Sequence, residues 1–233
     1  KKRRFRKEAK AMQQQEVLEV LKGGGAIITD SHIVYTSGRH GKAYVNKDAV
    51  FPHTHTISAL CGEIGQCFEK DHIEVVIAPA IGGVILSQWV AYHLTSWTHG
   101  EVLAVYAESE PPPDGVSGAL LPKRFVVKRG YDLLLSGKRV LVVEDILTTG
   151  GSAKAVVEVA RSLGGNVVGV GALVNRGGVT ATDLGNVPKL VALANLPLES
   201  WAETDCPLCR DGVRVNTDVG KGRDFLGKRS LRC

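Results

Sequence analysis

Apolar and polar positions follow one pattern in the first quarter of the chain and another in the remainder. Residues 11–22 place apolar side chains on one face of a short helix, which the glycines at 23–25 end. Residues 26–51 alternate apolar and polar positions, with turns at Ser37-Gly38 and His40-Gly41. This alternation predicts a small antiparallel hairpin region.

The remainder combines helical patterns with continuous apolar runs. Helices are predicted at 57–68 and 83–94. Apolar runs of strand length predict strands at 74–78, 102–107, 139–143, 167–174 and 190–194. Because these runs do not alternate with polar residues, helices are expected to cover both faces of the sheet, which is typical of a parallel sheet in an α/β fold. Ligands of such sheets bind at the carboxyl ends of the strands.

One long segment interrupts this regular order. Residues 108–123 contain Pro111-Pro112-Pro113 together with Gly115 and Gly118, and they predict a long loop. Loops of this length in compact domains often serve as lids. Closure of this segment over a bound ligand is therefore one expectation.

Length and charge indicate how the chain is divided into regions. Its 233 residues suffice for one α/β domain with additions. We expect a basic, disordered tail at 1–10, an N-terminal hood at 11–55, an α/β core at 56–200 and a C-terminal extension at 201–233. The tail holds seven of the 29 Lys and Arg residues and one of the 24 acidic residues, so the rest carries a net charge of −1. A nucleic-acid partner is therefore not expected.

Targeting signals are not evident in the sequence. No apolar run approaches the ~20 residues of a membrane-spanning helix. Polar residues follow the basic start where a secretory signal would have an apolar core. We therefore expect a cytoplasmic protein with no membrane partner.

The cysteines fall into two groups. Cys61 and Cys67 lie on the helix predicted at 57–68, among apolar residues, and are expected in the core. Cys206-Pro-Leu-Cys209 has the spacing of a metal-ligand pair, but no second cysteine pair follows, and Cys233 would reach the site only by folding back. We therefore expect reduced thiols in preference to zinc.

The stretch with the most informative chemistry runs from Arg139 to Gly165. Its apolar strand is followed by two acids, Glu144 and Asp145, and then by a loop of glycines and hydroxyl residues that opens a helix. Such a turn binds anions because unpaired N–H groups and the positive end of the helix dipole face it. The loop has neither the lysine of a P-loop nor the glycine spacing of a dinucleotide turn. Adjacent carboxylates accept hydrogen bonds from a vicinal diol, so this stretch predicts a site for a sugar phosphate.

This stretch resembles the phosphoribosyl pyrophosphate (PRPP) motif of the type I phosphoribosyltransferase family, in which an apolar strand, two acids and a Thr/Gly/Ser loop follow one another. The resemblance implies the fold of that family, a central parallel sheet flanked by helices, with a small N-terminal hood. It also implies that the acids hold the ribose hydroxyls and that the loop binds the 5-phosphate. The PRPP-binding residues implied in this stretch are Glu144, Asp145, Ile146, Leu147, Thr148, Thr149, Gly150, Gly151 and Ser152.

The pyrophosphate of PRPP is expected to meet two further segments. A tight turn after an earlier strand resembles the pyrophosphate loop of the family and consists of Ala80, Ile81, Gly82 and Gly83. Lys128 and Arg129 are cations at the position from which family members contact pyrophosphate, often across a subunit interface. The resemblance thus assigns catalytic roles to Lys128 and Arg129 beside Glu144 and Asp145, and it implies a homodimer.

Two segments resemble short-loop orotate phosphoribosyltransferases and point to the acceptor base. Residues 37–44 resemble the Ser-Gly-Arg-x-x-x-x-Tyr segment that lies over the base, and Arg176 matches the arginine that binds the orotate carboxylate. A guanidinium group pairs with a carboxylate through two parallel hydrogen bonds. The resemblance implies PRPP and orotate as substrates, with Mg²⁺ held mainly through PRPP and with no direct protein ligand. The implied base-binding residues are Ser37, Arg39, Tyr44, Thr148 and Arg176.

The chain departs from many orotate enzymes at three places. Gly82 and Thr36 stand where many members have lysine, and only eight residues separate Arg129 from Lys138. The mobile catalytic loop of the long-loop members therefore has no counterpart, which matches a short-loop subgroup that also has Cys-Pro-Leu-Cys near its end. Transfer to a purine or another base, and a PRPP-sensing regulator of the same fold, stay open as alternatives.

Overall fold

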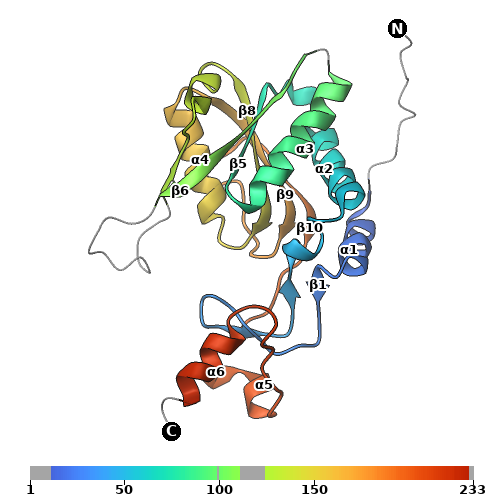
Figure 1. The fold of residues 1–233 in the computed structure, drawn as a ribbon, viewed down its shortest axis with the longest axis vertical. Coiled ribbons are helices and arrows are strands. Elements are labelled where there is room, and N and C mark those ends of the chain that lie inside the picture. The colour runs from blue at the N-terminus through green and yellow to red at the C-terminus, as the bar shows by residue number, and fades with distance from the viewer. Residues whose placement is uncertain (1–11, 99, 111–123, 231–233) are drawn as a thin grey trace.

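A central sheet of six strands forms the body of the protein, seen in a computed structural model that describes residues 12–98, 100–110 and 124–230 (Figure 1). All neighbouring strands are parallel except the last two. This confirms the predicted parallel sheet and adds a short antiparallel edge strand, whose three residues are too few to give a recognisable pattern. Across the sheet the strands are β10 (Leu190–Asn195), β9 (Asn166–Asn175), β8 (Arg139–Leu147), β5 (Val75–Pro79), β6 (Leu103–Glu110) and β7 (Arg124–Val126).

Helices cover both faces of this sheet, as the unbroken apolar runs predicted (Figure 1). On one face lie α1 (Gln14–Gly23), α2 (Thr54–Phe68) and α3 (Gly82–Trp97), and on the other lies α4 (Gly151–Ser162). Successive residues of β5 serve the two faces in turn. Val75 and Ile77 belong to the core beneath α4, whereas Val76 and Ala78 belong to the core beneath α2 and α3. Because β5 is buried on both faces, every position along it requires an apolar residue.

Strand β8 extends further than its apolar run predicted. It continues to Leu147, and Glu144 pairs in register with Ala172 of β9. The ladder with β9 holds the backbone of the two acids, so their side chains project from a paired strand and not from a loop. This gives the acids fixed positions at the carboxyl end of the sheet.

The hood contains two small antiparallel sheets where the sequence predicted one hairpin region. β1 (Ile27–Ile28) pairs with β4 (Tyr44–Val45), and β2 (Ile33–Val34) pairs with β3 (His40–Gly41). Four short 3-10 helices lie in connections between the other elements along the chain, and the first of them belongs to the hood: η1 (Lys47–Ala49), η2 (Glu69–Asp71), η3 (Tyr131–Leu134) and η4 (Glu203–Asp205).

The C-terminal segment lies beside the hood, although the two are far apart in the sequence (Figure 1). It carries α5 (Pro207–Arg210) and α6 (Gly222–Ser230). Isolated bridges join His32 to Val215 and His40 to Trp201. The small sheets of the hood and the C-terminal segment thus form one lobe below the central sheet, in the orientation of Figure 1.

Some sequence predictions concern residues outside the described part of the chain. These are the tail at 1–10, most of the loop predicted at 108–123, and Cys233. The first three residues of that loop, Glu108–Glu110, belong to strand β6. Among the described residues, no helix combines the length and the apolar character needed to cross a membrane.

Candidate active site

A cavity of about 650 Å³ lies at the carboxyl ends of β5 and β8. The hood, the turn after β5, the loop between β8 and α4, and Arg176 after β9 all contribute to its lining. This is the edge of the sheet at which α/β proteins bind their ligands. The stretch that the sequence singled out therefore lines a cavity at the expected edge of the sheet.

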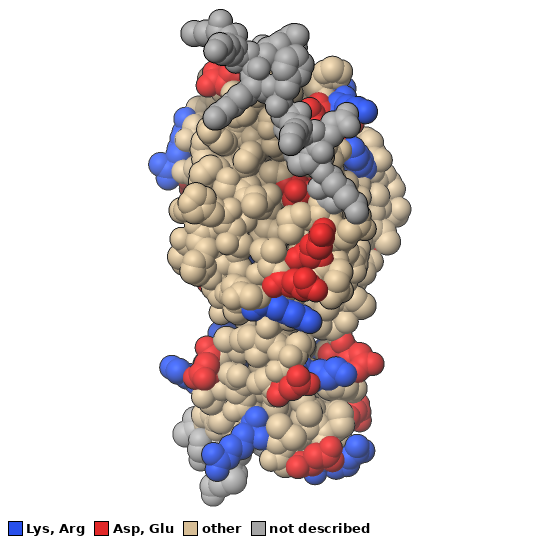
Figure 2. All heavy atoms as spheres, turned by 90° about the vertical axis from the view of Figure 1, so that its right-hand side faces the viewer, with Lys and Arg blue, Asp and Glu red and all other residues tan. Residues whose placement is uncertain are grey.

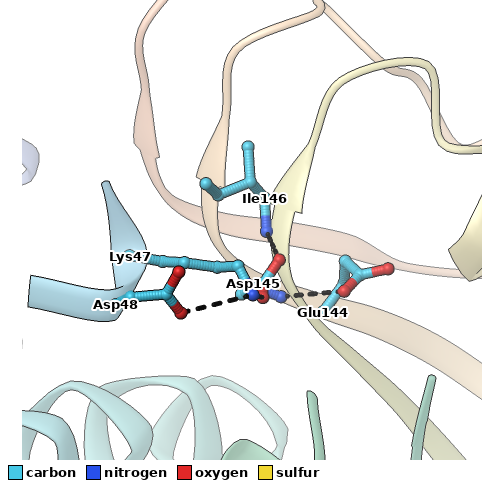
Figure 3. Close-up of polar contacts among 5 residues, drawn as sticks. All are labelled: Lys47, Asp48, Glu144, Asp145 and Ile146. Atoms are coloured by element: carbon cyan, nitrogen blue, oxygen red, sulfur yellow. Dashed lines mark hydrogen bonds and ion pairs between the residues drawn. The ribbon is translucent and has the colours of Figure 1, made fainter. Parts of the chain in front are cut away.

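The acid pair projects into this cavity from β8. Glu144 and Asp145 are each only 7% exposed. One carboxylate oxygen of Asp145, Oδ1, accepts a hydrogen bond from the backbone N–H of Ile146 at 2.6 Å. The other, Oδ2, lies 2.8 Å from the ammonium of Lys47, which reaches in from η1 of the hood (Figure 3). The acid pair is thus bridged to the hood by an ion pair.

Burial sets the protonation of this cluster. Loss of water, and then the negative charge of Asp145, raise the pKa of Glu144 to about 8. Burial alone would lower the pKa of Lys47, but its hydrogen bond and attraction to Asp145 outweigh burial and raise that pKa. Near pH 7 Glu144 therefore holds its proton, while Lys47 and Asp145 form an ion pair. The cluster then offers an O–H donor and carboxylate acceptors to a diol.

The loop after the acids, which is the predicted anion cradle, lies along the cavity. All nine predicted residues, Glu144 to Ser152, line the cavity. Gly150 precedes the first residue of α4 and has a φ of 75°. A side chain there would also come within 2.8 Å of Leu184 and 2.9 Å of Val179. Glycine therefore fits this turn, and a side chain would be both strained and crowded there.

The turn after β5 lies opposite this cradle. Ala80, Ile81 and Gly82 line the cavity, and the peptide between the first two is cis. Gly83 is buried behind the turn, where a β-carbon would lie 2.7 Å from that of Ala78. A side chain at Gly82 would collide with the Asp145 carboxylate and the Lys47 ammonium. The absence of a side chain at Gly82 therefore leaves room for the Lys47–Asp145 pair.

The two predicted pyrophosphate cations lie elsewhere. Lys128 and Arg129 are exposed after β7 and do not belong to the cavity lining of their own chain. The Arg129 guanidinium instead pairs with Glu108 at 2.9 Å. Within one chain the structure therefore does not bring these cations to the acid pair.

The base side of the cavity contains four of the five predicted residues: Ser37, Tyr44, Thr148 and Arg176. Arg176 donates from Nε to Thr148 Oγ1 at 3.0 Å, and its guanidinium lies 4.9 Å from the centre of the Tyr35 ring. These contacts hold the guanidinium between the phosphate loop and the hood. Arg39 is the exception, because its guanidinium donates to Ser200 in the C-terminal segment.

Seven lining residues were not assigned from the sequence: Tyr35, Thr36, Val45, Lys47, Pro79, Ser109 and Phe125. Tyr35 and Thr36 adjoin the predicted base segment, so extending that segment by two residues would have found them. Lys47 carries no such signal. It stands among alternating residues after β4, and only the folded hood brings it to Asp145.

Comparison with known proteins defines the class of this fold and site. Residues 54–191 match the model of the phosphoribosyl transferase domain, so the chain belongs to the phosphoribosyltransferase family. That membership confirms the family and fold predicted from the PRPP motif.

Its relatives narrow the class further. The chain is 36% identical to the orotate phosphoribosyltransferase of Caldanaerobacter subterraneus subsp. tengcongensis, over 87% of this chain and 95% of the relative. It is 38% identical to the orotate phosphoribosyltransferase of Pelotomaculum thermopropionicum, with the same coverage of 87% and 95%. Among solved structures, the orotate phosphoribosyltransferase of Aeropyrum pernix superimposes with a TM-score of 0.59 at 26% identity, covering 77% of this chain and 93% of that one.

Proposed function

We propose that this protein is an orotate phosphoribosyltransferase, which transfers ribose 5-phosphate from PRPP to orotate and releases pyrophosphate and orotidine 5-monophosphate. The relatives that carry this name agree with the acceptor predicted from the sequence. The product is a pyrimidine nucleotide, so the reaction belongs to pyrimidine nucleotide synthesis.

The placement of Arg176 is the observation that best supports orotate as the acceptor base. Its guanidinium lines the same cavity as the acid pair and the phosphate loop, beside Thr148 and the ring of Tyr35. A planar carboxylated base fits this arrangement, because the guanidinium pairs with the carboxylate and the tyrosine ring offers a flat wall. A purine without a carboxylate would leave this cation without its anionic partner.

The residues of the chain support a reaction that depends on position and electrostatics. The phosphate loop holds the 5-phosphate, and Glu144 and Asp145 hold the ribose hydroxyls. The bond from C1 to the pyrophosphate oxygen breaks, and its electron pair leaves with pyrophosphate. A ring nitrogen of orotate then supplies the electron pair of the new bond to C1, and the proton that this nitrogen carried is released to water or to pyrophosphate. The negative charge of Asp145 favours the positive charge that develops on the ribose.

The donor atoms fit a magnesium ion that the substrate carries. Lys47 already pairs with Asp145, so the described carboxylates do not form a cage of protein ligands alone. Mg²⁺ commonly keeps one or two carboxylates and takes its other ligands from phosphates and water. When bound, the ion would be held mainly by the oxygens of PRPP and would neutralise charge on the pyrophosphate.

We also propose a homodimer in which Lys128 and Arg129 serve the site of the neighbouring copy. Both side chains are exposed in the single chain, in agreement with a role across an interface. Helix α3 contains no Lys, Arg, Asp or Glu and exposes Tyr92 by 57%. Figure 2 looks onto the side that carries α2 and α3, where an uncharged area lies beside a row of acidic residues. We propose this side as the interface, and the cytoplasm as the location of the enzyme.

A panel of bases tests the proposed reaction. The protein is incubated with PRPP, Mg²⁺ and one base at a time, and released pyrophosphate is measured. Orotate should support turnover, while adenine, hypoxanthine and uracil should not. Turnover with a purine and not with orotate would overturn the acceptor, and PRPP binding without turnover on any base would support the regulator.

A further inference from the structure

Four side chains with metal-binding atoms meet in the lower lobe, away from the cavity. They are His32, His40, Cys206 and Cys209. His32 precedes β2 and His40 lies in β3, whereas Cys206 directly precedes α5 and Cys209 lies within it. The two histidines and the two cysteines are separated by more than 160 residues, and none of the four lines the cavity. The cluster is therefore separate from the substrate site.

The distances within this cluster match a tetrahedral site. His32 Nε2 lies 2.9 Å from His40 Nδ1, and Cys209 Sγ lies 3.6 Å and 3.3 Å from these two nitrogens. Cys206 Sγ lies 3.7 Å from His32 Nε2, and all four atoms are within 4.8 Å of one another. Zinc bonds of about 2.0–2.1 Å to nitrogen and about 2.3 Å to sulfur space tetrahedral ligands about 3.3–3.8 Å apart. A zinc ion therefore fits between these atoms with only small shifts.

The partner of His32 fixes which of its nitrogens faces the cluster. His32 Nδ1 lies 2.7 Å from the carbonyl oxygen of Val213. A carbonyl only accepts, so Nδ1 carries the proton and Nε2 presents its lone pair to the cluster. Zinc-binding histidines are commonly oriented in this way by a backbone carbonyl. His32, His40 and Cys206 are buried, and the ring of His40 lies edge-on to Phe225 at 4.9 Å. The surroundings thus exclude most water from the ligand atoms.

We propose that His32, His40, Cys206 and Cys209 bind one structural zinc ion that clamps the C-terminal segment to the hood. Two thiolates and two imidazoles are a typical structural zinc set, with four protein ligands and no open position for a substrate. The sequence showed only the cysteine half of this set. Its other half comes from two histidines eight positions apart, one just before β2 and one in β3, which the pairing of these strands brings together.

The position of the proposed zinc site gives the ion a role in shaping the base side of the cavity. The loop between the two histidines contains Tyr35 and Ser37, which line the cavity. The same loop contains Arg39, whose guanidinium donates to Ser200, near the cysteines in sequence. Zinc at this place would hold both ends of the loop against the C-terminal segment. The ion would thus position the base-contacting loop without touching substrate.

Metal analysis of the purified full-length protein tests the site. The wild type, prepared without chelator, should contain about one zinc per chain, and Cys206→Ser and Cys209→Ser should lose most of it. Cys67→Ser is the matched control, because Cys67 is half-buried on α2 and should leave the zinc content unchanged. Co²⁺ exchanged into the wild type should give the intense visible absorption of a tetrahedral thiolate site. This last measurement does not depend on the variants folding.

Two results would overturn the proposal. One is a wild type that retains no zinc and gives no tetrahedral spectrum with Co²⁺. The other is a disulfide between Cys206 and Cys209 in protein purified under reducing conditions. The positioning role has its own test, in which a chelator removes the ion. The Kd for orotate should then rise by more than the Kd for PRPP and recover when Zn²⁺ is restored, and equal changes in the two constants would contradict that role.

Discussion

The two sides of the cavity are built in opposite ways. The donor side comes mainly from one continuous segment, Glu144 to Ser152, supported by the turn at 80–82. The base side combines hood residues with Arg176, and Arg39 in the hood bonds to Ser200, 161 residues away. A site built from one segment forms wherever its strand and helix form. A site assembled from distant segments depends on how the lobes are held together.

This difference separates two kinds of failure. Changes on the donor side should impair PRPP use through local contacts, and changes on the base side should impair orotate binding, often through packing. Lys47 is the exception, because it belongs to the hood and pairs with Asp145 of β8. It couples the two sides of the cavity, so variants that break this coupling can be compared with variants that change one side alone.

The largest loss is expected from Gly82→Val. The new side chain would occupy the space of the Asp145 carboxylate and the Lys47 ammonium and displace both. Displacement of reacting groups by about 1 Å can cost about 10²-fold in rate, so kcat/KM for PRPP should fall by at least about that factor. Gly100→Ala is the control, because a β-carbon there meets no atom within 4 Å. Wild-type kinetics for Gly82→Val would refute the proposed packing.

Mixed dimers should show whether the exposed cations act across an interface. Arg129→Ala and Asp145→Asn should each be nearly inactive alone. If Arg129 serves the neighbouring copy, a mixed dimer regains one intact site, and random exchange restores roughly a quarter of the wild-type activity. Activity is measured after the two variants are unfolded and refolded together. If mixing restores nothing while size measurements show mixed dimers, Arg129 does not act across the interface.

Glu144→Gln should stabilise the protein in a pH-dependent manner. The pKa of Glu144 is raised from 4.5 to about 8 in the folded protein, so the folded state binds a proton that the unfolded state releases between these values. Stability is therefore lost as pH rises from about 4.5 through about 8, and the variant escapes this loss. The gain in Tm of the variant should be larger at pH 8 than at pH 5. Each kcal/mol added to the free energy of unfolding should raise Tm by about 2–4 °C. Glu158→Gln, exposed on α4, should show little change at either pH, and an equal gain for Glu144→Gln at both pH values would contradict the assignment.

A smaller effect is expected from Arg39→Ala. Arg39 does not line the cavity, and its loss removes hydrogen bonds to Ser200 that are worth about 0.5–1.5 kcal/mol each. The Kd for orotate should rise only a few-fold, with the Kd for PRPP unchanged. A rise as large as that of Arg176→Ala would mean that Arg39 contacts the base directly, as the sequence resemblance implied.

The same contrast explains what the sequence could predict. The donor segment was recognisable because its strand, acids, loop and helix are adjacent in the chain, and periodicity alone predicted the sheet and its helices. β7 was missed because three residues give no period. Lys47 and the two histidines were missed because their partners lie in distant segments, at Asp145 and at Cys206 and Cys209. Long-range pairing of this kind leaves no local pattern.

The central claim is that one cavity holds separable donor and base sides, and calorimetry on two variants tests it most directly. Arg176→Ala should raise the Kd for orotate by the equivalent of about 2–4 kcal/mol and leave PRPP binding near the wild-type value. Asp145→Asn should weaken PRPP binding and leave orotate binding, measured with pyrophosphate present, nearly unchanged. If Arg176→Ala weakens PRPP binding and spares orotate, the division of the cavity described above is wrong.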